Sequence, residues 1–249
     1  KKIKIGREYI KIYSPSSILN WRVKTYFSKE PETLKWIKEF KLSNKSKIIF
    51  WDIGANVGLY SLYSCFIHAK DIEVVSFEPS VNNLKSLATN ISINNFEDQV
   101  KICSNPLNDK VKFSKLNESS FIEGSALNSF ANNFDFEGKK FDPILSYQTF
   151  GLTLDYLIDN SHLKIPNYIK IDVDGNEHLI LKGLKNNLSK KEICEIMIEI
   201  NENYKEQLDS ITATMMQSNF KLADKFKASI LDQKEDNFSK TYNYLFKKL

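Results

Sequence analysis

The chain of 249 residues is 42% hydrophobic and contains only six prolines, so it can bury one large core and has no stretch with the composition of a long linker. It contains no run of about twenty apolar residues and no apolar signal core near its N-terminus, from which we expect a soluble chain without a membrane-spanning helix. Lys1 is not an initiator residue, which leaves open whether further residues precede it.

The formal net charge of +4 is unevenly distributed along the chain. Residues 1–47 contain 13 Lys and Arg against four Glu, which fits an anionic partner and equally a solvated lysine-rich surface. Only Arg7 and Arg22 are arginines in this segment, whereas a nucleic-acid surface usually interleaves arginines with aromatic residues. The composition therefore argues against a nucleic-acid partner.

The cysteines and histidines show no spacing typical of a metal site. Cys65, Cys103 and Cys194 are far apart, and one would stay unpaired if the other two formed a disulfide. The three histidines are equally scattered. We therefore expect reduced cysteines in a cytoplasmic protein.

The first 47 residues predict a cap on the core. Alternating apolar and basic residues up to Tyr13 favour a short peripheral hairpin. Residues 28–33 predict a helix start, because Pro31 suits a first turn and Leu34 and Ile37 follow at helical spacing. We expect this helix to cover one side of the first core strand.

From residue 48 onwards, apolar strands alternate with helices. Ile48–Ile53, Ile72–Phe77 and Val100–Cys103 are short runs typical of buried strands, and residues 59–67 and 81–94 carry apolar side chains at helical spacing. Such alternation predicts a parallel sheet with right-handed crossovers.

Residues 112–151 interrupt this alternation. They contain eight Phe and Tyr among Ser, Asn and Gly, which is too aromatic for a linker and too irregular for one helix. A segment of this kind is usually a binding element or a small satellite sheet. Contact with a substrate and simple packing against the core are equally good interpretations.

The remaining chain returns to strands and helices. The strand that begins at Tyr168 carries Lys170, Asp172 and Asp174 on one face. Buried charges are costly unless they are paired, so a Lys–Asp pair or a function must explain them. The other predicted elements are a helix over residues 152–158 capped by Thr153, a helix ending at Leu188, a strand over 193–200, a helix around 208–216, and an antiparallel pair over 220–226 and 242–246.

The most informative motif follows the first core strand. This strand ends in Asp52, and Gly54 and Gly58 then bracket Asn56 before a helix starts. Glycine permits close backbone approach and Asn tolerates positive φ, so the turn suits a ligand held at the start of a helix. On its own, the pattern also fits an ordinary strand-to-helix turn.

Further polar residues follow the next two strands. Glu78 lies 26 residues after Asp52, at the end of the second strand, where a carboxylate commonly holds the hydroxyls of a ribose. Ser104 and Asn105 end the third strand at the same edge of the sheet. Together with the turn, these residues predict a site for a ribose-bearing cofactor.

The order of these motifs resembles the FkbM family of S-adenosylmethionine-dependent methyltransferases over nearly the whole chain. Two positions depart from the family pattern, which usually has Glu in place of Asp174 and a small residue in place of Asn176. The matching segments are residues 29–37, 52–61, 77–80, 152–155 and 169–177.

The resemblance implies an α/β, Rossmann-like methyltransferase fold, with a seven-stranded, mostly parallel sheet, an antiparallel terminal strand and helices on both faces. We expect one domain over residues 1–249, in which a cap (1–47) precedes a Rossmann-like core (48–249) that carries the 112–151 insert. The resemblance also implies S-adenosylmethionine as cofactor, S-adenosylhomocysteine as product, and methylation of a hydroxyl on a sugar, glycolipid or polyketide.

The same resemblance assigns residues to the cofactor pocket. Asp52, Gly54, Asn56 and Gly58 would shape its methionine end, Glu78 would hold the ribose, and Ser104 or Asn105 would lie near the adenine.

Four residues are candidates for a general base that removes a proton from the acceptor hydroxyl. Asp172 comes first, because its strand delivers it to the carboxyl edge of the sheet, and Asp174 comes second. A structural pair with Lys170, or a hydrogen bond to the amino group of the cofactor, explains Asp172 equally well. His178 and Glu199 follow, with a solvated helix surface and helix capping as their alternative roles.

A metal site and two other functions compete with this interpretation. Asp172, Asp174 and Glu199 have the oxygen ligands that Mg²⁺ prefers, but the full alternating pattern of a calcium loop is lacking and we expect no metal. An NAD-type oxidoreductase would need Gly-x-Gly-x-x-Gly, which the turn does not provide. A non-catalytic nucleotide-binding module could share the fold. We expect a small-molecule or glycan acceptor, with an anionic group if it contacts the basic cap.

Overall fold

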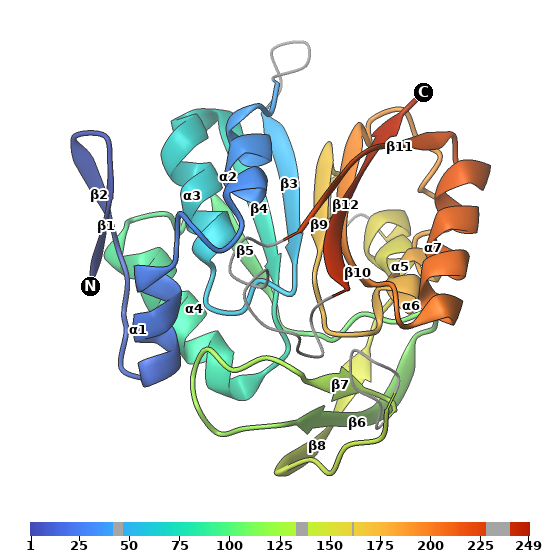
Figure 1. The fold of residues 1–249 in the computed structure, drawn as a ribbon, viewed down its shortest axis with the longest axis horizontal. Helices are drawn as coiled ribbons and strands as arrows, with labels where there is room; N and C mark the ends of the chain where they lie inside the picture. Colours follow the sequence, from blue (N-terminus) through green and yellow to red (C-terminus); the bar gives the residue numbers. More distant parts are fainter. Residues whose placement is uncertain (42–46, 133–138, 161, 228–239) are drawn as a thin grey trace.

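The structure, a computed structural model, describes residues 1–41, 47–132, 139–160, 162–227 and 240–249 (Figure 1). Its central sheet consists of β3 (Ile48–Ile53), β4 (Ile72–Phe77), β5 (Val100–Cys103), β9 (Tyr168–Ile171), β10 (Glu195–Asn201), β11 (Phe220–Phe226) and β12 (Thr241–Lys248). The strand order is β11-β12-β10-β9-β3-β4-β5. Neighbours from β10 to β5 pair in parallel, whereas β12 is antiparallel to β10 and β11. The predicted seven-stranded sheet with an antiparallel terminal strand is confirmed.

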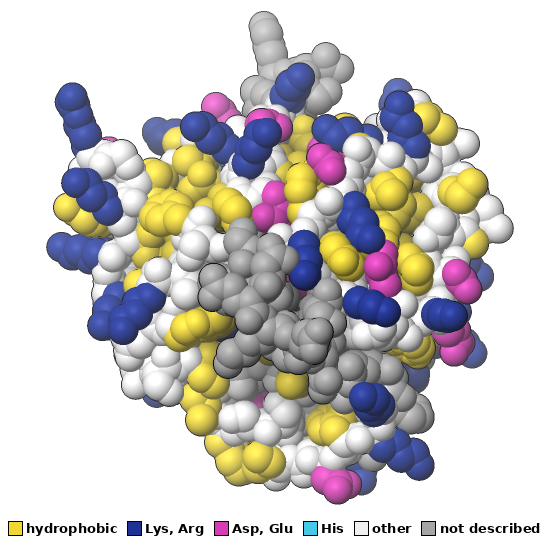
Figure 2. Space-filling model, viewed as in Figure 1, with side chains coloured by type: hydrophobic (Ala, Val, Ile, Leu, Met, Phe, Trp, Pro, Cys, Tyr) yellow, Lys and Arg dark blue, Asp and Glu magenta, His cyan; other side chains and the backbone are white. Residues whose placement is uncertain are grey.

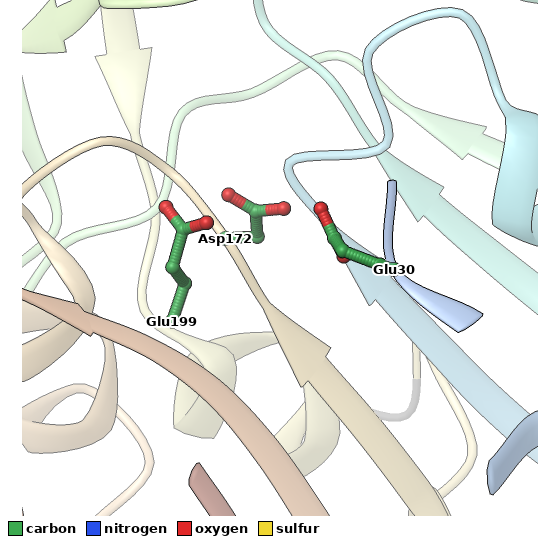
Figure 3. A group of neighbouring side chains, drawn as sticks. All are labelled: Glu30, Asp172 and Glu199. Carbon is green, nitrogen blue, oxygen red and sulfur yellow. The ribbon is translucent and has the colours of Figure 1, made fainter. Parts of the chain in front are cut away.

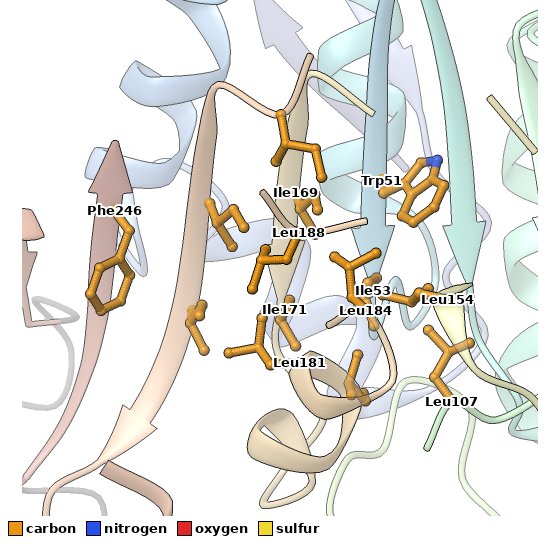
Figure 4. Close-up of a cluster of buried hydrophobic side chains, with 14 of the residues drawn as sticks. Trp51, Ile53, Leu107, Leu154, Ile169, Ile171, Leu181, Leu184, Leu188 and Phe246 are labelled. Carbon is orange, nitrogen blue, oxygen red and sulfur yellow. The ribbon is translucent and has the colours of Figure 1, made fainter. Parts of the chain in front are cut away.

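Helices cover both faces of this sheet. One face packs against α2 (Pro31–Lys38), α3 (Leu59–His68) and α4 (Val81–Ile93), and the other against α5 (Leu154–Asp159), α6 (Glu177–Lys182) and α7 (Lys205–Gln217). A short 3-10 helix, η1 (Ala69–Asp71), follows α3. All six residues of β3 are buried, because both sides of the strand are covered. On the face covered by α5, α6 and α7, Trp51 and Ile53 of β3 pack in one hydrophobic cluster with Leu154 and Leu181 (Figure 4).

The N-terminal cap contains one helix that the sequence did not predict. The expected hairpin is present as β1 (Lys2–Ile5) and β2 (Glu8–Lys11). Between it and α2 lies α1 (Ser17–Lys24), whose N-cap Ser16 accepts a hydrogen bond from the backbone N–H of Leu19 at 3.1 Å. Only Leu19 is buried in α1, so the sequence lacks a clear stripe of apolar residues from which this helix could be predicted.

The insert forms a satellite sheet with the order β7-β6-β8, so that one of the two predicted forms is confirmed. Its strands are β6 (Lys112–Glu118), β7 (Ser129–Phe130) and β8 (Leu145–Gly151), and both pairings are antiparallel. Phe134 and Phe136 lie outside the described residues. Figure 1 shows the small sheet beyond the carboxyl ends of β3 and β4, which is the edge where the motifs converge.

The helix expected to end at Leu188 is shorter than predicted. Helix α6 ends at Lys182, because the carbonyl of Gly183 accepts from the N–H of Asp155 at 2.8 Å instead of continuing the helix. The carboxylate of Asp155 then accepts from the N–H groups of Asn186 and Asn187, which holds the following turns. Within the described ranges, no helix has the length and apolar character needed to cross a membrane.

Candidate active site

A cavity of about 510 Å³ lies at the carboxyl edge of the parallel strands. Its volume is within the range of pockets that bind cofactors and small substrates. Residues from the cap, from the turn after β3, from the end of β4, from the insert, and from the ends of β9 and β10 line it. The cavity therefore joins the predicted cofactor motifs to the two segments that lie outside the central sheet, the cap and the insert.

The turn at residues 54–58 approaches β9 as closely as glycine permits. Gly54 has φ +83°, and a Cβ on it would lie 1.8 Å from the carbonyl oxygen of Asp172. The N–H groups of Gly54 and Ala55 both donate to the carbonyl of Phe77 at 3.0 Å, which ties the turn to β4. Asn56 has φ +53° and Gly58 φ +84°, as expected for a sharp turn.

Glu78 lies beside this turn and is only 5% exposed. Its two carboxylate oxygens accept from the N–H groups of Asn56 and Ser80, each at 2.8 Å. Burial raises the pKa of Glu78 to about 8, although these hydrogen bonds oppose the shift. A carboxylate oxygen has more than one lone pair, so Glu78 keeps acceptor capacity for hydroxyl groups in the cavity.

The cavity wall also fits a polar ligand at the methionine end of the predicted pocket. The Oδ1 atom of Asn56 is buried and has no hydrogen-bond partner among the described residues. Buried polar atoms are rarely left unpaired, so this oxygen marks a position where a donor group of a ligand fits. Asn105 also lines the cavity, and its side chain donates to the carbonyl of Phe150 at 3.0 Å.

Three predicted cofactor residues do not line the cavity. Asp52 is buried below the turn and accepts a hydrogen bond from Ser61 at 2.6 Å. Gly58 provides the N-cap of α3, and Ser104 is exposed outside the lining. Asn105, the other residue predicted near the adenine, does line the cavity.

Three carboxylates converge in the cavity from different parts of the chain. Oxygen atoms of Glu30, Asp172 and Glu199 lie within 4.8 Å of one another, and Figure 3 shows them pointing toward a common space. Glu30 precedes α2 and was not predicted as a site residue. Lys29 pairs with Glu30 at 2.7 Å and Lys170 pairs with Asp172, so lysines neutralise two of the three carboxylates.

The environments of these three carboxylates differ. Burial alone would raise the pKa of Glu30, but Lys29 and Lys170 hold it well below its ordinary value. Burial and the nearby Asp172 raise the pKa of Glu199 well above its ordinary value. Among the residues that the structure describes, no ion pair neutralises Glu199. The cluster therefore combines two paired carboxylates with one that favours protonation, which is typical of acid–base sites.

Asp174 lines the cavity, whereas His178 does not. Asp174 has φ +61° and accepts from the N–H of Leu127 at 2.7 Å, and burial followed by the charge of Asp172 raises its pKa to about 6. The ring of His178 packs edge-on against Tyr204, with 5.8 Å between centroids, and burial lowers its pKa. The structure thus brings together three of the four predicted base candidates.

Residues 119–128 of the insert, here called the strap, lie along the cavity and contact the elements around it. The carbonyl of Ser125 accepts from the side chain of Asn56 at 2.7 Å, and the N–H of Gly124 donates to Asn83 at 2.8 Å. Arg22 donates to the carbonyl of Gly124 at 2.9 Å. These bonds connect the strap to the cap, to the turn and to α4.

Comparison with solved structures establishes the fold. A methyltransferase FkbM from Methylobacillus flagellatus KT has 16% identity and a TM-score of 0.51, with 92% of this chain and 52% of that chain covered. A precorrin-6y C5,15-methyltransferase from Geobacter metallireducens GS-15 has 13% identity and a TM-score of 0.50, over 88% and 87%. The fibrillarin pre-rRNA processing protein of Methanococcus jannaschii has 15% identity and a TM-score of 0.52, over 100% and 82%.

These comparisons also limit what the fold can say. The chain spans about half the length of the Methylobacillus protein. No curated protein sequence matches it. A family model described as the methyltransferase FkbM domain matches residues 52–225, from the end of β3 into β11. This match does not favour the alternative of a dinucleotide-binding oxidoreductase. With this match over most of its length and a methyltransferase fold around the cavity, the chain belongs to the FkbM methyltransferase family.

Proposed function

We propose that this protein transfers a methyl group from S-adenosylmethionine to a hydroxyl oxygen of a small-molecule or glycan acceptor, leaving S-adenosylhomocysteine. The observation that carries this proposal is the cavity in which Glu78, Asn56 and Gly54 meet at the end of two adjacent parallel strands. A ligand with a ribose and a charged tail fits this arrangement at a crevice between strand ends. The proposal needs no metal ion.

Different lining residues would hold different parts of such a donor. Glu78 would accept hydrogen bonds from both ribose hydroxyls, and Asn105 would contact the adenine. Gly54 allows the methionine end to pass close to the backbone, where Asn56 offers its unpaired Oδ1. The donor supplies an activated methyl group on a positively charged sulfur, and the protein contributes mainly by aligning this carbon with the acceptor oxygen.

The charge of the cavity suits a cationic donor. Five lining side chains are carboxylates, and only Arg22 and Lys29 are cationic among the described lining residues. A negative environment favours binding of a positively charged sulfur and amine over their neutral counterparts. The five lining carboxylates are Glu30, Glu78, Asp172, Asp174 and Glu199.

Glu199 is the best supported general base among the predicted candidates. Glu199 lines the cavity, and its carboxylate forms no ion pair among the described residues, so it is free to accept a proton from an acceptor hydroxyl. Asp172 is held by Lys170, and Asp174 accepts a hydrogen bond from the strap. We therefore assign proton removal to Glu199, and to Asp172 and Asp174 the positioning of Lys170 and of the strap.

The cap and the strap are proposed to select the acceptor. Both lie outside the cofactor motifs, and both contribute side chains to the same cavity, including Trp21 from α1 and Leu127 from the strap. Lysine and arginine side chains are dispersed over the face seen in Figure 2 and do not form one continuous block, which favours a small acceptor over a nucleic acid.

The three cysteines are free, which fits the reducing cytoplasm.

A methyl-transfer experiment tests the function. Purified protein is incubated with S-adenosylmethionine carrying a deuterated methyl group and with fractions of small metabolites, glycans and RNA, and the products are analysed by mass spectrometry. The expected result is a labelled hydroxylated small molecule or glycan, and labelling that is about 100-fold slower or more with the Glu199→Gln variant. Label in RNA would contradict the proposed acceptor class. Donor binding without any labelled product would indicate a non-catalytic module.

A further inference from the structure

Arg22 is set apart by residue type and by position. Only two of the 35 basic residues of the chain are arginines. Arg7 is exposed in the turn of the N-terminal hairpin, whereas Arg22 belongs to α1 and lines the cavity. A guanidinium presents a planar set of donors that matches a carboxylate, which a lysine ammonium does not. The single arginine of the cavity is therefore suited to a planar anion.

The side chain of Arg22 is positioned but not neutralised. Its Nε–H donates to the carbonyl of Gly124 at 2.9 Å, which fixes the guanidinium against the strap. Within the described part of the chain, no carboxylate forms an ion pair with it. The other cation of the lining, Lys29, already pairs with Glu30 at 2.7 Å. Arg22 thus has terminal N–H groups available for a ligand.

A side pocket next to the main cavity places Arg22 near the turn. The lining of this pocket, of about 50 Å³, includes five residues that also line the main cavity: Arg22, Lys29, Gly54, Asn56 and Asp172. It lies at the methionine end of the proposed donor site. A small polar group of a ligand that passes Gly54 would enter this pocket and meet the guanidinium.

We propose that Arg22 binds the α-carboxylate of the donor. This inference rests on the proposed function, because it assumes that S-adenosylmethionine occupies the cavity. The donor combines a cationic sulfur and amine with one carboxylate, and among the described lining residues only Arg22 and Lys29 are cationic. Lys29 pairs with Glu30, so Arg22 is the side chain that can form a charge-assisted hydrogen-bonded pair with this carboxylate. The cap, which precedes the residues of the family match, would thereby complete the donor site.

The first test compares two ligands on the unmodified protein by titration calorimetry. Decarboxylated S-adenosylmethionine keeps the cationic sulfur, the amine and the nucleoside, but lacks the α-carboxylate. We expect it to bind about 10- to 100-fold more weakly than S-adenosylmethionine. Equal affinities would overturn the role of Arg22 while leaving the proposed function intact. Absence of binding by either ligand would overturn the proposed function itself.

The second test uses Arg22→Gln, with Arg7→Gln as the matched control, and thermal unfolding as a check on the fold. In Arg22→Gln we expect weaker binding of S-adenosylmethionine and unchanged binding of its decarboxylated analogue, so that the difference between the two ligands disappears. Arg7→Gln should retain the difference. Equal weakening of both ligands, or an effect confined to the KM of the acceptor, would contradict recognition of the donor carboxylate.

Discussion

The chemistry of the proposed donor site depends most on one buried side chain, Glu78. Its carboxylate is almost fully removed from water, and it is held by two backbone N–H groups. Burial raises the pKa to about 8, so the protonated form dominates at neutral pH in the ligand-free protein. Hydroxyl groups of a ribose donate more strongly to a carboxylate than to a carboxylic acid. Ligand binding and ionisation of Glu78 should therefore favour each other.

This coupling predicts a pH dependence of nucleoside binding. Because the ionised form of Glu78 increases as the pH rises toward 8, affinity for adenosine should increase between pH 6 and pH 8, by up to about tenfold per unit. Adenosine has the ribose but no group that titrates in this range. Calorimetry at several pH values measures the effect. Glu78→Gln should remove the dependence, and an unchanged slope in a folded variant would reject the ribose role.

The proposed general base leads to a prediction that separates Glu199 from Asp172. Glu199→Gln should lower kcat about 100-fold or more while the donor affinity stays the same, because the base acts only on the acceptor. Asp172→Asn should instead destabilise the fold by roughly 2–4 kcal/mol, since it leaves the buried Lys170 without its partner. Steady-state kinetics, donor titration and chemical denaturation are compared. A larger loss of kcat in folded Asp172→Asn would transfer the role of base to Asp172.

Among the elements, the turn at residues 54–58 tolerates the least change. The turn follows β3, and two of its N–H groups donate to the last residue of β4. Gly54 also lies against the carbonyl of Asp172, directly after β9. The positive φ and the lack of space both exclude a side chain at this position. The turn therefore sets the distance between the proposed donor site and the charged end of β9.

Gly54→Ala should destabilise the protein by more than about 3 kcal/mol, because the new Cβ would overlap with backbone atoms. Gly6→Ala is the matched control: Gly6 also has a positive φ, of +62°, but open space surrounds it. The control should lose only about 1 kcal/mol, which is the backbone cost alone. Urea denaturation of both variants measures the difference. Similar losses in the two would show that the close contact with Asp172 is not important.

Elements buried on both sides were predictable from the sequence, and elements defined by distant partners were not. β3 and β4 are short, mainly apolar runs, and the sequence predicted both with the bounds that the structure shows. Helix α1 buries only Leu19 and carries little periodicity. Helix α6 ends early because Gly183 and Asp155 meet across the fold. A local sequence pattern does not indicate such a contact between residues that are distant in the sequence.

The same distinction applies to the site. Gly54, Asn56 and Glu78 were predicted, because strand ends and turn residues reveal the carboxyl edge of a parallel sheet. Glu30 and Arg22 were missed as site residues, since the cap that carries them reaches the cavity only through tertiary packing. The net positive charge of the cap was visible in the sequence, but it did not indicate which of the basic residues faces inward.

On the scale of the whole molecule, three parts of the chain build one acidic cavity. The sheet supplies the cofactor motifs, the cap supplies Glu30 and Arg22, and the insert supplies the strap. Hydrogen bonds from Arg22 and from Asn56 to the strap connect these parts directly. The fold and the family are those of methyltransferases, and the central claim is that this cavity holds S-adenosylmethionine.

Titration calorimetry with S-adenosylmethionine tests this claim most directly. The unmodified protein should show saturable binding of one donor per chain, and NAD should give no heat of binding. Glu78→Ala should bind the donor about 10- to 100-fold more weakly and remain folded. Glu8→Ala, a control in the exposed hairpin, should bind it normally. Saturable binding of NAD in place of S-adenosylmethionine, or equal donor affinity in folded Glu78→Ala, would contradict the account.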